Sequence, residues 1–196
     1  TNAVRIPKLT RRRFLYAAGG AVASVCGAYS YTRWIEPHWL DVVRRDMPIE
    51  GLPASLAGKT LVQISDLHIG STDPDHLAAC IKTVNALRPD LLVITGDFMT
   101  CTRDERVDSV PKVVETLQAP LGVFAVAGNH DYGGRWDRIE VADALGKRLN
   151  GCGIRMLRNE AVTVSGLQLL GLDDLWAKQF RVIPFDRRKP TVALSH

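Results

Sequence analysis

The body of this chain, from Leu52 to His196, is predicted to be an α/β domain with helices covering the faces of its sheet. Short apolar runs containing β-branched residues alternate with segments in which apolar residues recur every three or four positions. Further along the chain the apolar runs become shorter and lie closer together, as in directly connected strands. Several runs also end abruptly in Asp, His or Asn, which is typical of strands that lead into a functional edge.

The order of the expected elements follows from these runs and from the prolines and glycines between them. Pro89 ends the first expected helix, Pro111 lies in the first turn of the second, and Gly151 ends the third. These helices are expected at residues 76–87, 107–118 and about 138–150. Strands are expected at residues 60–65, 91–95, 122–126, 154–157, 161–165, 167–172 and 191–195.

Residues 1–50 form a separate segment, predicted to be an export signal and membrane anchor ahead of the domain at 51–196. A basic front that ends at Arg13 is followed by 19 residues without charge, Phe14 to Thr32. Thr10 to Leu15 resembles the twin-arginine export signal, and a generic basic cluster before an anchor is the alternative. We therefore expect export by the twin-arginine machinery to the periplasmic face of the cytoplasmic membrane, with the leader retained or slowly cleaved.

The net charge of +4 belongs entirely to that first segment. Residues 1–50 hold 8 Lys and Arg against 4 Asp and Glu, whereas residues 51–196 hold 17 of each. A folded domain that binds nucleic acid needs a basic face, so no nucleic-acid partner is expected. The cysteines are too scattered for a disulfide framework or a zinc site and are interpreted as semi-buried thiols: Cys26, Cys80, Cys101 and Cys152.

Candidate site residues follow four of the expected strands. They are Asp66 and His68 after the first strand, Asp97 after the second, Asn129, His130 and Asp131 after the third, and His196 after the last. Each group alone would pass for an ordinary turn. Because ligands of open α/β sheets collect at the carboxyl ends of the strands, we expect these residues to converge. Asp66 and His68 are two positions apart, so on an extended chain both project to one side and can reach one ion.

A divalent cation explains why acidic residues would gather at buried strand ends. Carboxylates held close together repel one another, which raises their pKa values and costs stability. A bound cation removes that penalty because its charge dominates the local field. Mixed Asp, His and Asn ligands suit Mn²⁺, iron or Zn²⁺, so a metal-dependent activity is predicted.

Residues 55–196 resemble the calcineurin-like metallophosphoesterases. The resemblance rests on Asp66-x-His68, Gly96-Asp97, Gly128-Asn129-His130-Asp131 and the late His196. The segments SDLHIG, GNHDYGG and GLDDLW, behind the RRRFL leader, look like the bacterial membrane-associated, YkuE/YaeI-like branch, which is similar to UDP-2,3-diacylglucosamine pyrophosphatases. The resemblance implies an α-β-β-α sandwich of two mixed sheets, incomplete at the C-terminus, and two divalent metal ions.

The resemblance also implies a role for each candidate residue. Asp66 and His68 would bind the first metal ion, Asn129 and His196 would bind the second, and Asp97 would bridge the two. His130 would stabilise the phosphorus centre or protonate the leaving oxygen, and Asp131 would orient His130. The expected reaction is hydrolysis of a phosphodiester or pyrophosphate, and the membrane anchor suggests a lipid-linked substrate.

One departure from the family pattern concerns the end of the chain. The family closes its site with a Gly-His-x-His segment, and the sequence ends at His196, so the chain is interpreted as C-terminally truncated and short of two ligands. The remaining histidines, His38 and His76, are interpreted as surface residues. Two alternatives stay open: a soluble periplasmic phosphodiesterase acting on nucleotides, and a non-catalytic scaffold with the same fold.

Further residues are expected beside the site. Asp173 and Asp174 are assigned to the border of the cleft or to a solvated loop, and Trp176 to packing. Tyr132, Gly133 and Gly134 are interpreted as a flexible rim, and Arg187, Arg188 and Lys189 as a phosphate-binding run or a solvated turn.

Overall fold

The computed structural model describes residues 10–100 and 104–196. The chain divides into two compact units between Arg44 and Arg45. Cys101 and the residues of the basic front before Thr10 lie outside the described residues. Cys80 and Cys152 are half-buried free thiols as expected, whereas Cys26 is exposed.

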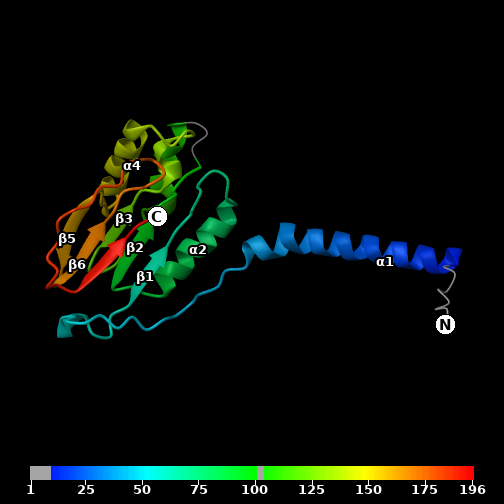
Figure 1. The fold of residues 1–196 in the computed structure, drawn as a ribbon, viewed down its shortest axis with the longest axis horizontal. Helices are drawn as coiled ribbons and strands as arrows, with labels where there is room; N and C mark the ends of the chain where they lie inside the picture. The colour runs from blue at the N-terminus through cyan, green and yellow to red at the C-terminus, as the bar shows by residue number, and fades with distance from the viewer. Residues whose placement is uncertain (1–9, 101–103) are drawn as a thin grey trace, which may run out of the picture. The chain divides into compact units, whose positions relative to one another are not determined.

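The first unit is dominated by the helix α1, which runs from Arg11 to Ser30 (Figure 1). The Thr10 hydroxyl caps this helix by accepting a hydrogen bond from the Arg13 amide at 3.4 Å. A π turn at Tyr31–Ile35 and a 3₁₀ turn at Glu36–His38 follow. No α1 side chain is buried. Among the helices of the described residues, none combines the length and apolar character that crossing a membrane requires.

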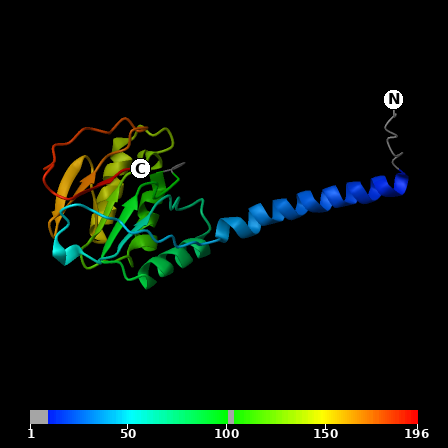
Figure 2. The ribbon, with the colours of Figure 1, turned by 60° about the horizontal axis from the view of Figure 1, so that its bottom comes forward.

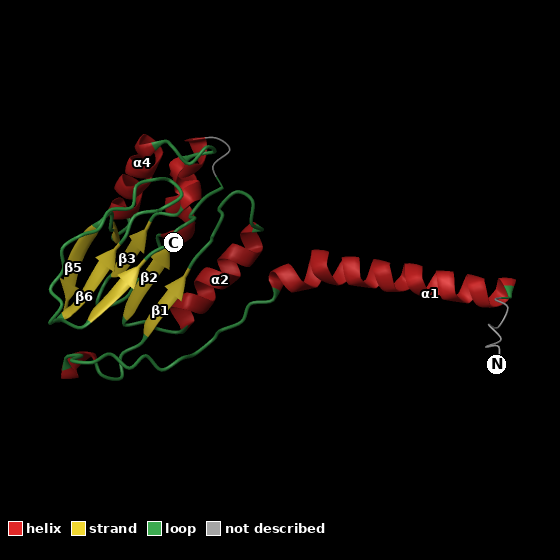
Figure 3. Cartoon of the chain, viewed as in Figure 1, coloured by secondary structure: helices red, strands yellow, loops and turns green. Residues whose placement is uncertain are grey.

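The second unit is built on a four-stranded sheet in the order β1-β2-β3-β4. Its strands are β1 (Leu61–Ile64), β2 (Leu91–Thr95), β3 (Val123–Val126) and β4 (Ile154–Met156). Every neighbouring pair is parallel, so each connection must cross over the sheet. The crossovers carry the helices α2 (Pro74–Ala86), α3 (Val110–Val114) and α4 (Ile139–Gly151) (Figure 3).

A second, three-stranded sheet follows β4 in the chain. It consists of β5 (Glu160–Val164), β6 (Leu167–Gly171) and β7 (Thr191–Leu194). β5 and β6 form an antiparallel hairpin, and β7 lies parallel to β6. The expectation of two mixed sheets is therefore corrected for the first sheet, which is parallel in the described residues. Its strands run one way because a helical crossover separates each from the next.

The central strands are buried on both faces, which explains their continuous apolar sequences. In β2, Leu92 and Ile94 pack with the helices, whereas Leu91 and Val93 pack with the second sheet. Successive strand residues point to opposite faces, so a strand between two apolar layers is apolar along most of its length. Within the second unit, Figures 1 and 2 show α2 and α4 on one side of the first sheet and the second sheet on the other side.

The helices and strands lie close to their expected positions, with one exception. The helix expected at 107–118 is a 3₁₀ turn at Asp104–Ser109 followed by the five-residue α3. Pro111 lies at the start of α3, because proline has no amide hydrogen to donate to the preceding turn. The α-helical hydrogen-bond pattern therefore cannot extend back to residue 107.

Candidate metal centre

The loops that follow β1 and β2 lie side by side and form the backbone of the candidate site. The amides of Asp66 and His68 donate hydrogen bonds to the carbonyl oxygens of Gly96 and Asp97, at 3.1 and 3.0 Å. The Ile69 amide continues the series and donates to Phe98 at 2.8 Å. Parallel pairing thus extends past the ends of the strands and places Asp66 and His68 beside Asp97.

Three candidate ligands have a left-handed backbone. The φ angles of Asp66, His68 and Asp97 are 57°, 43° and 54°. Such angles cost of the order of 1–3 kcal/mol at a non-glycine residue, and they cluster at functional sites. Asp66 and His68 therefore reach one site through a turned backbone, and not through the extended chain that their spacing had suggested.

Asp97 lies at the centre of the converging loops. Its side chain is 4% exposed, and its Oδ2 atom lies 3.6 Å from Nε2 of His68 and 3.4 Å from Nε2 of His196. Its other oxygen, Oδ1, accepts a hydrogen bond from the His130 amide at 3.0 Å. One carboxylate thus contacts residues that follow β1, β3 and β7, as the convergence of strand ends predicts.

Both imidazoles are held through the nitrogen that faces away from Asp97. Nδ1 of His196 lies 2.8 Å from the Thr95 carbonyl oxygen. A carbonyl can only accept, so Nδ1 carries a proton, and in the neutral ring Nε2 has the lone pair that a metal ion would use. Nδ1 of His68 lies 2.9 Å from the Thr100 hydroxyl, which can either accept from the ring or donate to it. Ligand histidines are commonly oriented by such a partner on the second nitrogen.

The donor set fits a divalent cation. Asp66, His68 and Asp97 each offer one ligand atom, and these atoms lie within 4.8 Å of one another. Carboxylate oxygen and imidazole nitrogen together suit Mn²⁺, iron and Zn²⁺. Burial lowers the pKa of His196, but the Thr95 carbonyl and the carboxylates of Asp97, Asp66 and Asp174 outweigh it and raise the pKa overall. The electrostatic field of these carboxylates therefore favours a positive charge at the site.

A short 3₁₀ turn after β3, Asn129–Tyr132, carries the remaining candidates. Asn129 is half-buried and follows Gly128, which packs directly against Asp97. The His130 ring stands edge-on to the His68 ring, with 5.2 Å between the centroids. On its other side, His130 contacts Trp136 at 5.7 Å in the same edge-on manner. His130 thus borders the metal centre and is contacted by two rings.

Asp131 has a different environment from the one expected. It is fully buried, and its carboxylate accepts hydrogen bonds from the amides of Gly128 at 3.0 Å and Met99 at 3.3 Å. Burial is the main reason that its pKa rises to about 7. The carboxylate ties the turn after β3 to the loop after β2. This placement differs from the expectation that Asp131 orients the His130 imidazole.

Several neighbours of the site are placed differently from the sequence-based interpretation. Asp173 and Asp174 are 2% and 1% exposed, so they do not belong to a solvated loop. Tyr132 is fully buried and is no flexible rim, whereas Trp176 is 73% exposed and contacts Trp136 edge-on. His38 is exposed as expected, but His76 is half-buried and its Nε2 lies 3.5 Å from Cys80 Sγ.

Sequence reasoning missed Trp136 and Arg158 as neighbours of the site. Trp136 follows no expected strand, and Arg158 comes directly after the expected strand at 154–157 but is not an Asp, His or Asn that would mark it as a ligand, so only their contacts identify them. Arg187, Arg188 and Lys189 are exposed, and Arg188 pairs with Asp186 at 3.0 Å, which agrees with the solvated-turn alternative.

The fold and the site together define an α/β protein with a candidate divalent-cation centre at the carboxyl edge of a parallel sheet. Residues 59–196 match the family of calcineurin-like phosphoesterases. The chain therefore belongs to that family.

Curated relatives agree with this assignment. YkuE, an uncharacterized metallophosphoesterase of Bacillus subtilis, is 31% identical over 86% of this chain. The UDP-2,3-diacylglucosamine pyrophosphatases LpxG of Chlamydia trachomatis and Chlamydia muridarum are 30% and 28% identical over 83% and 89% of the chain. The matched regions cover 61% of YkuE and 64% and 68% of the two LpxG proteins, so the chain spans about two thirds of these relatives' length.

Proposed function

We propose that this chain is the catalytic part of a metal-dependent hydrolase that cleaves phosphodiester or pyrophosphate bonds. The observation that carries the proposal is the convergence at Asp97, whose Oδ2 atom faces Nε2 of both His68 and His196 at 3.6 and 3.4 Å. Membership of the calcineurin-like phosphoesterases supports a phosphoester as the class of substrate.

The proposed cofactors are two divalent cations, with Mn²⁺, iron or Zn²⁺ as the candidates. Asp66 and His68 would hold one ion, Asn129 and His196 would hold the other, and Asp97 would be shared between them. When bound, a metal pair of this kind supplies a hydroxide nucleophile near neutral pH and stabilises the negative charge that develops at phosphorus.

His130 is the proposed proton donor to the leaving oxygen. Its backbone amide donates a hydrogen bond to Oδ1 of Asp97 at 3.0 Å. This bond holds the backbone of His130 next to the carboxylate at the centre of the site. Its imidazole lies beside His68 and Trp136. Imidazole is the commonest general acid in enzymes because it exchanges protons near neutral pH. Asp131 would act through the backbone, by holding Gly128 and Met99.

A lipid-linked pyrophosphate is the proposed substrate. The relatives named LpxG are UDP-2,3-diacylglucosamine pyrophosphatases, which supports this class of substrate for the similar chain described here. The exposed apolar side chains of α1, among them Phe14, Leu15 and Val25, support an N-terminal segment that associates with a membrane. We propose that the body acts at the periplasmic face after export by the twin-arginine machinery.

The test measures hydrolysis of UDP-2,3-diacylglucosamine and of bis(4-nitrophenyl) phosphate by the whole chain, before and after Mn²⁺ is added to chelator-treated protein. The Asp97→Asn variant should lose more than about 100-fold in rate, because even supporting partners of metal ligands contribute about 10- to 100-fold. Asp108→Asn is the matched control, since Asp108 is exposed and pairs with Arg148 on the surface.

Each outcome of this test has a clear meaning. Metal-dependent turnover that disappears in Asp97→Asn but not in Asp108→Asn supports the proposed hydrolase. Turnover of the aryl diester without any preference for the lipid would favour the soluble nucleotide phosphodiesterase. Wild-type protein that binds Mn²⁺ and hydrolyses neither substrate would contradict the proposal and favour a scaffold.

A further inference from the structure

A buried polar network adjoins the turn that carries His130. Tyr132, two residues after His130, is fully buried, and its hydroxyl donates a hydrogen bond to Oδ1 of Asp173. The same hydroxyl accepts a hydrogen bond from Nη2 of Arg158 at 2.9 Å. Both hydrogen-bonding capacities of the phenol oxygen are thus used by residues from other parts of the chain.

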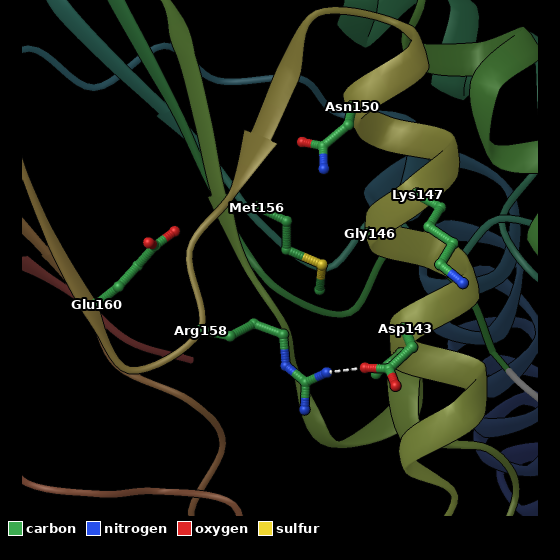
Figure 4. A pocket seen from close by; sticks show the side chains of 8 residues that line it. Asp143, Gly146, Lys147, Asn150, Met156, Arg158 and Glu160 are labelled. Carbon is green, nitrogen blue, oxygen red and sulfur yellow. Dashed lines mark hydrogen bonds and ion pairs between the residues drawn. The ribbon is translucent and has the colours of Figure 1, made fainter.

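Arg158 is the centre of this network. It lies between β4 and β5, its Nε donates to Oδ2 of Asp173 at 3.0 Å, and its Nη1 donates to Asp143 of α4. Figure 4 shows the guanidinium reaching across to Asp143. The guanidinium carbon also lies 5.3 Å from the centre of the Tyr132 ring. Arginine can make all of these contacts at once because its planar group carries five donors in a fixed arrangement.

Asp173 connects the network to the opposite side of the site. Its amide donates to the Asn159 side chain at 3.1 Å, and the neighbouring Leu172 amide donates to the Leu194 carbonyl of β7 at 2.9 Å. β7 leads two residues later to His196. The segment after β6 is therefore bound both to the turn of His130, through Tyr132, and to the strand that carries His196.

The turn of His130 is short, and contacts with other loops hold it, among them the bond of the His130 amide to Asp97 and the bond of Asp131 to the Met99 amide. Asn129–Tyr132 is a single 3₁₀ turn, and such turns have poorer hydrogen-bond geometry than an α-helix. The Tyr132 carbonyl accepts from the Arg138 amide at 2.9 Å, so Tyr132 also anchors the loop that carries Trp136. Trp136 in turn contacts the His130 ring. Fixing Tyr132 therefore fixes both the backbone of His130 and one of its ring neighbours.

We propose that Arg158 and Asp173 are positioning residues that act through Tyr132 to hold the His130 imidazole at the metal centre. The proposal rests on the proposed function for its catalytic consequence, but the placement of His130 can be measured without catalysis. Among the described residues, neither Arg158 nor Asp173 forms a hydrogen bond with a candidate metal ligand. Their proposed role is therefore distinct from metal binding.

Two variants and a matched control test the proposal. Tyr132→Phe removes only the hydroxyl and leaves the buried ring and the Arg158–Asp173 ion pair in place. Arg158→Lys keeps the positive charge but cannot contact Tyr132, Asp173 and Asp143 together. Arg148→Lys is the control, because Arg148 makes an exposed pair with Asp108 and lies on the same helix as Asp143.

The first readout is the order of the His130 ring, measured by ¹³C relaxation in histidine-labelled whole chain at one pH, with His76 as the internal reference. We expect both variants, and not the control, to increase ring motion at His130 and leave His76 unchanged. The second readout is hydrolysis, where kcat should fall by about 10- to 100-fold, because a displacement of 1 Å can cost about 100-fold. KM and the Mn²⁺ dissociation constant should stay within about twofold of wild type.

These readouts separate failure of the proposal from failure of the proposed function. If the wild-type chain hydrolyses nothing, the proposed function fails, and the His130 relaxation still decides whether the network positions the ring. A folded Tyr132→Phe protein with wild-type His130 order would overturn the proposal. If Arg158→Lys does not fold, Tyr132→Phe alone decides, because it removes no charge and leaves no cavity larger than an oxygen atom.

Discussion

Replacing Gly128 by alanine tests whether the loops after β2 and β3 must touch for the candidate site to form. Gly128 has a φ of −99°, which any residue adopts, so the backbone itself tolerates a side chain. The obstacle is space. A Cβ atom at this position would lie 2.2 Å from Oδ1 of Asp97 and 2.5 Å from the Asp97 amide nitrogen.

The size of the effect follows from these distances. Favourable contacts between heavy atoms lie at about 3.5 Å or more, so Gly128 and Asp97 must separate by more than about 1 Å. The hydrogen bonds from His130 to Asp97 and from Gly128 to Asp131, both 3.0 Å, lie at this contact and would be strained or broken. We expect Gly128→Ala to lower the free energy of unfolding by about 1–3 kcal/mol, the usual cost of overpacking. Mn²⁺ affinity should fall by about 10- to 100-fold, since Asp97 loses a supporting contact.

Titration calorimetry with Mn²⁺ and urea unfolding of the chelator-treated protein measure the two effects separately. Gly151→Ala is the control, because a Cβ at Gly151, the last residue of α4, meets nothing within 4 Å. That change should leave Mn²⁺ affinity unchanged and alter stability by less than about 1 kcal/mol. Wild-type Mn²⁺ affinity and stability in Gly128→Ala would refute the inferred close contact with Asp97.

Two further predictions concern pH and metal removal. Burial and the hydrogen bond to Asp173 raise the pKa of Tyr132, so its contribution to stability is complete below about pH 10 and is lost as the pH rises further. Urea unfolding between pH 8 and 11 should therefore show a shallower alkaline loss of stability in Tyr132→Phe, and equal slopes would contradict this. Mn²⁺ at about 100 times its dissociation constant should stabilise the wild-type chain by about 2.7 kcal/mol. Thermal unfolding with Mn²⁺ or EDTA should show no such shift in Asp97→Asn, and an absent shift in wild type would count against the metal centre.

The sequence by itself determined the α/β class, the places of the strands and the residues that converge at their ends. Each of these features is visible in a short stretch of the sequence. A strand that is buried on both faces is continuously apolar, and where such a strand ends at a functional site, Asp, His or Asn follows it. For this reason Asp66, His68, Asp97 and His196 could be grouped before any contact was known.

Only the tertiary structure decided what surrounds these residues. Asp131 could not be placed from the sequence, because its partners include Met99, 32 positions earlier in the chain. Tyr132 lies in a glycine-rich segment typical of a flexible rim, yet it is buried, and its hydroxyl donates a hydrogen bond to Asp173, 41 positions later. Such contacts leave no periodic trace in the sequence. They arise when separate loops pack at one edge of the sheet, where most buried polar groups find a partner in another loop.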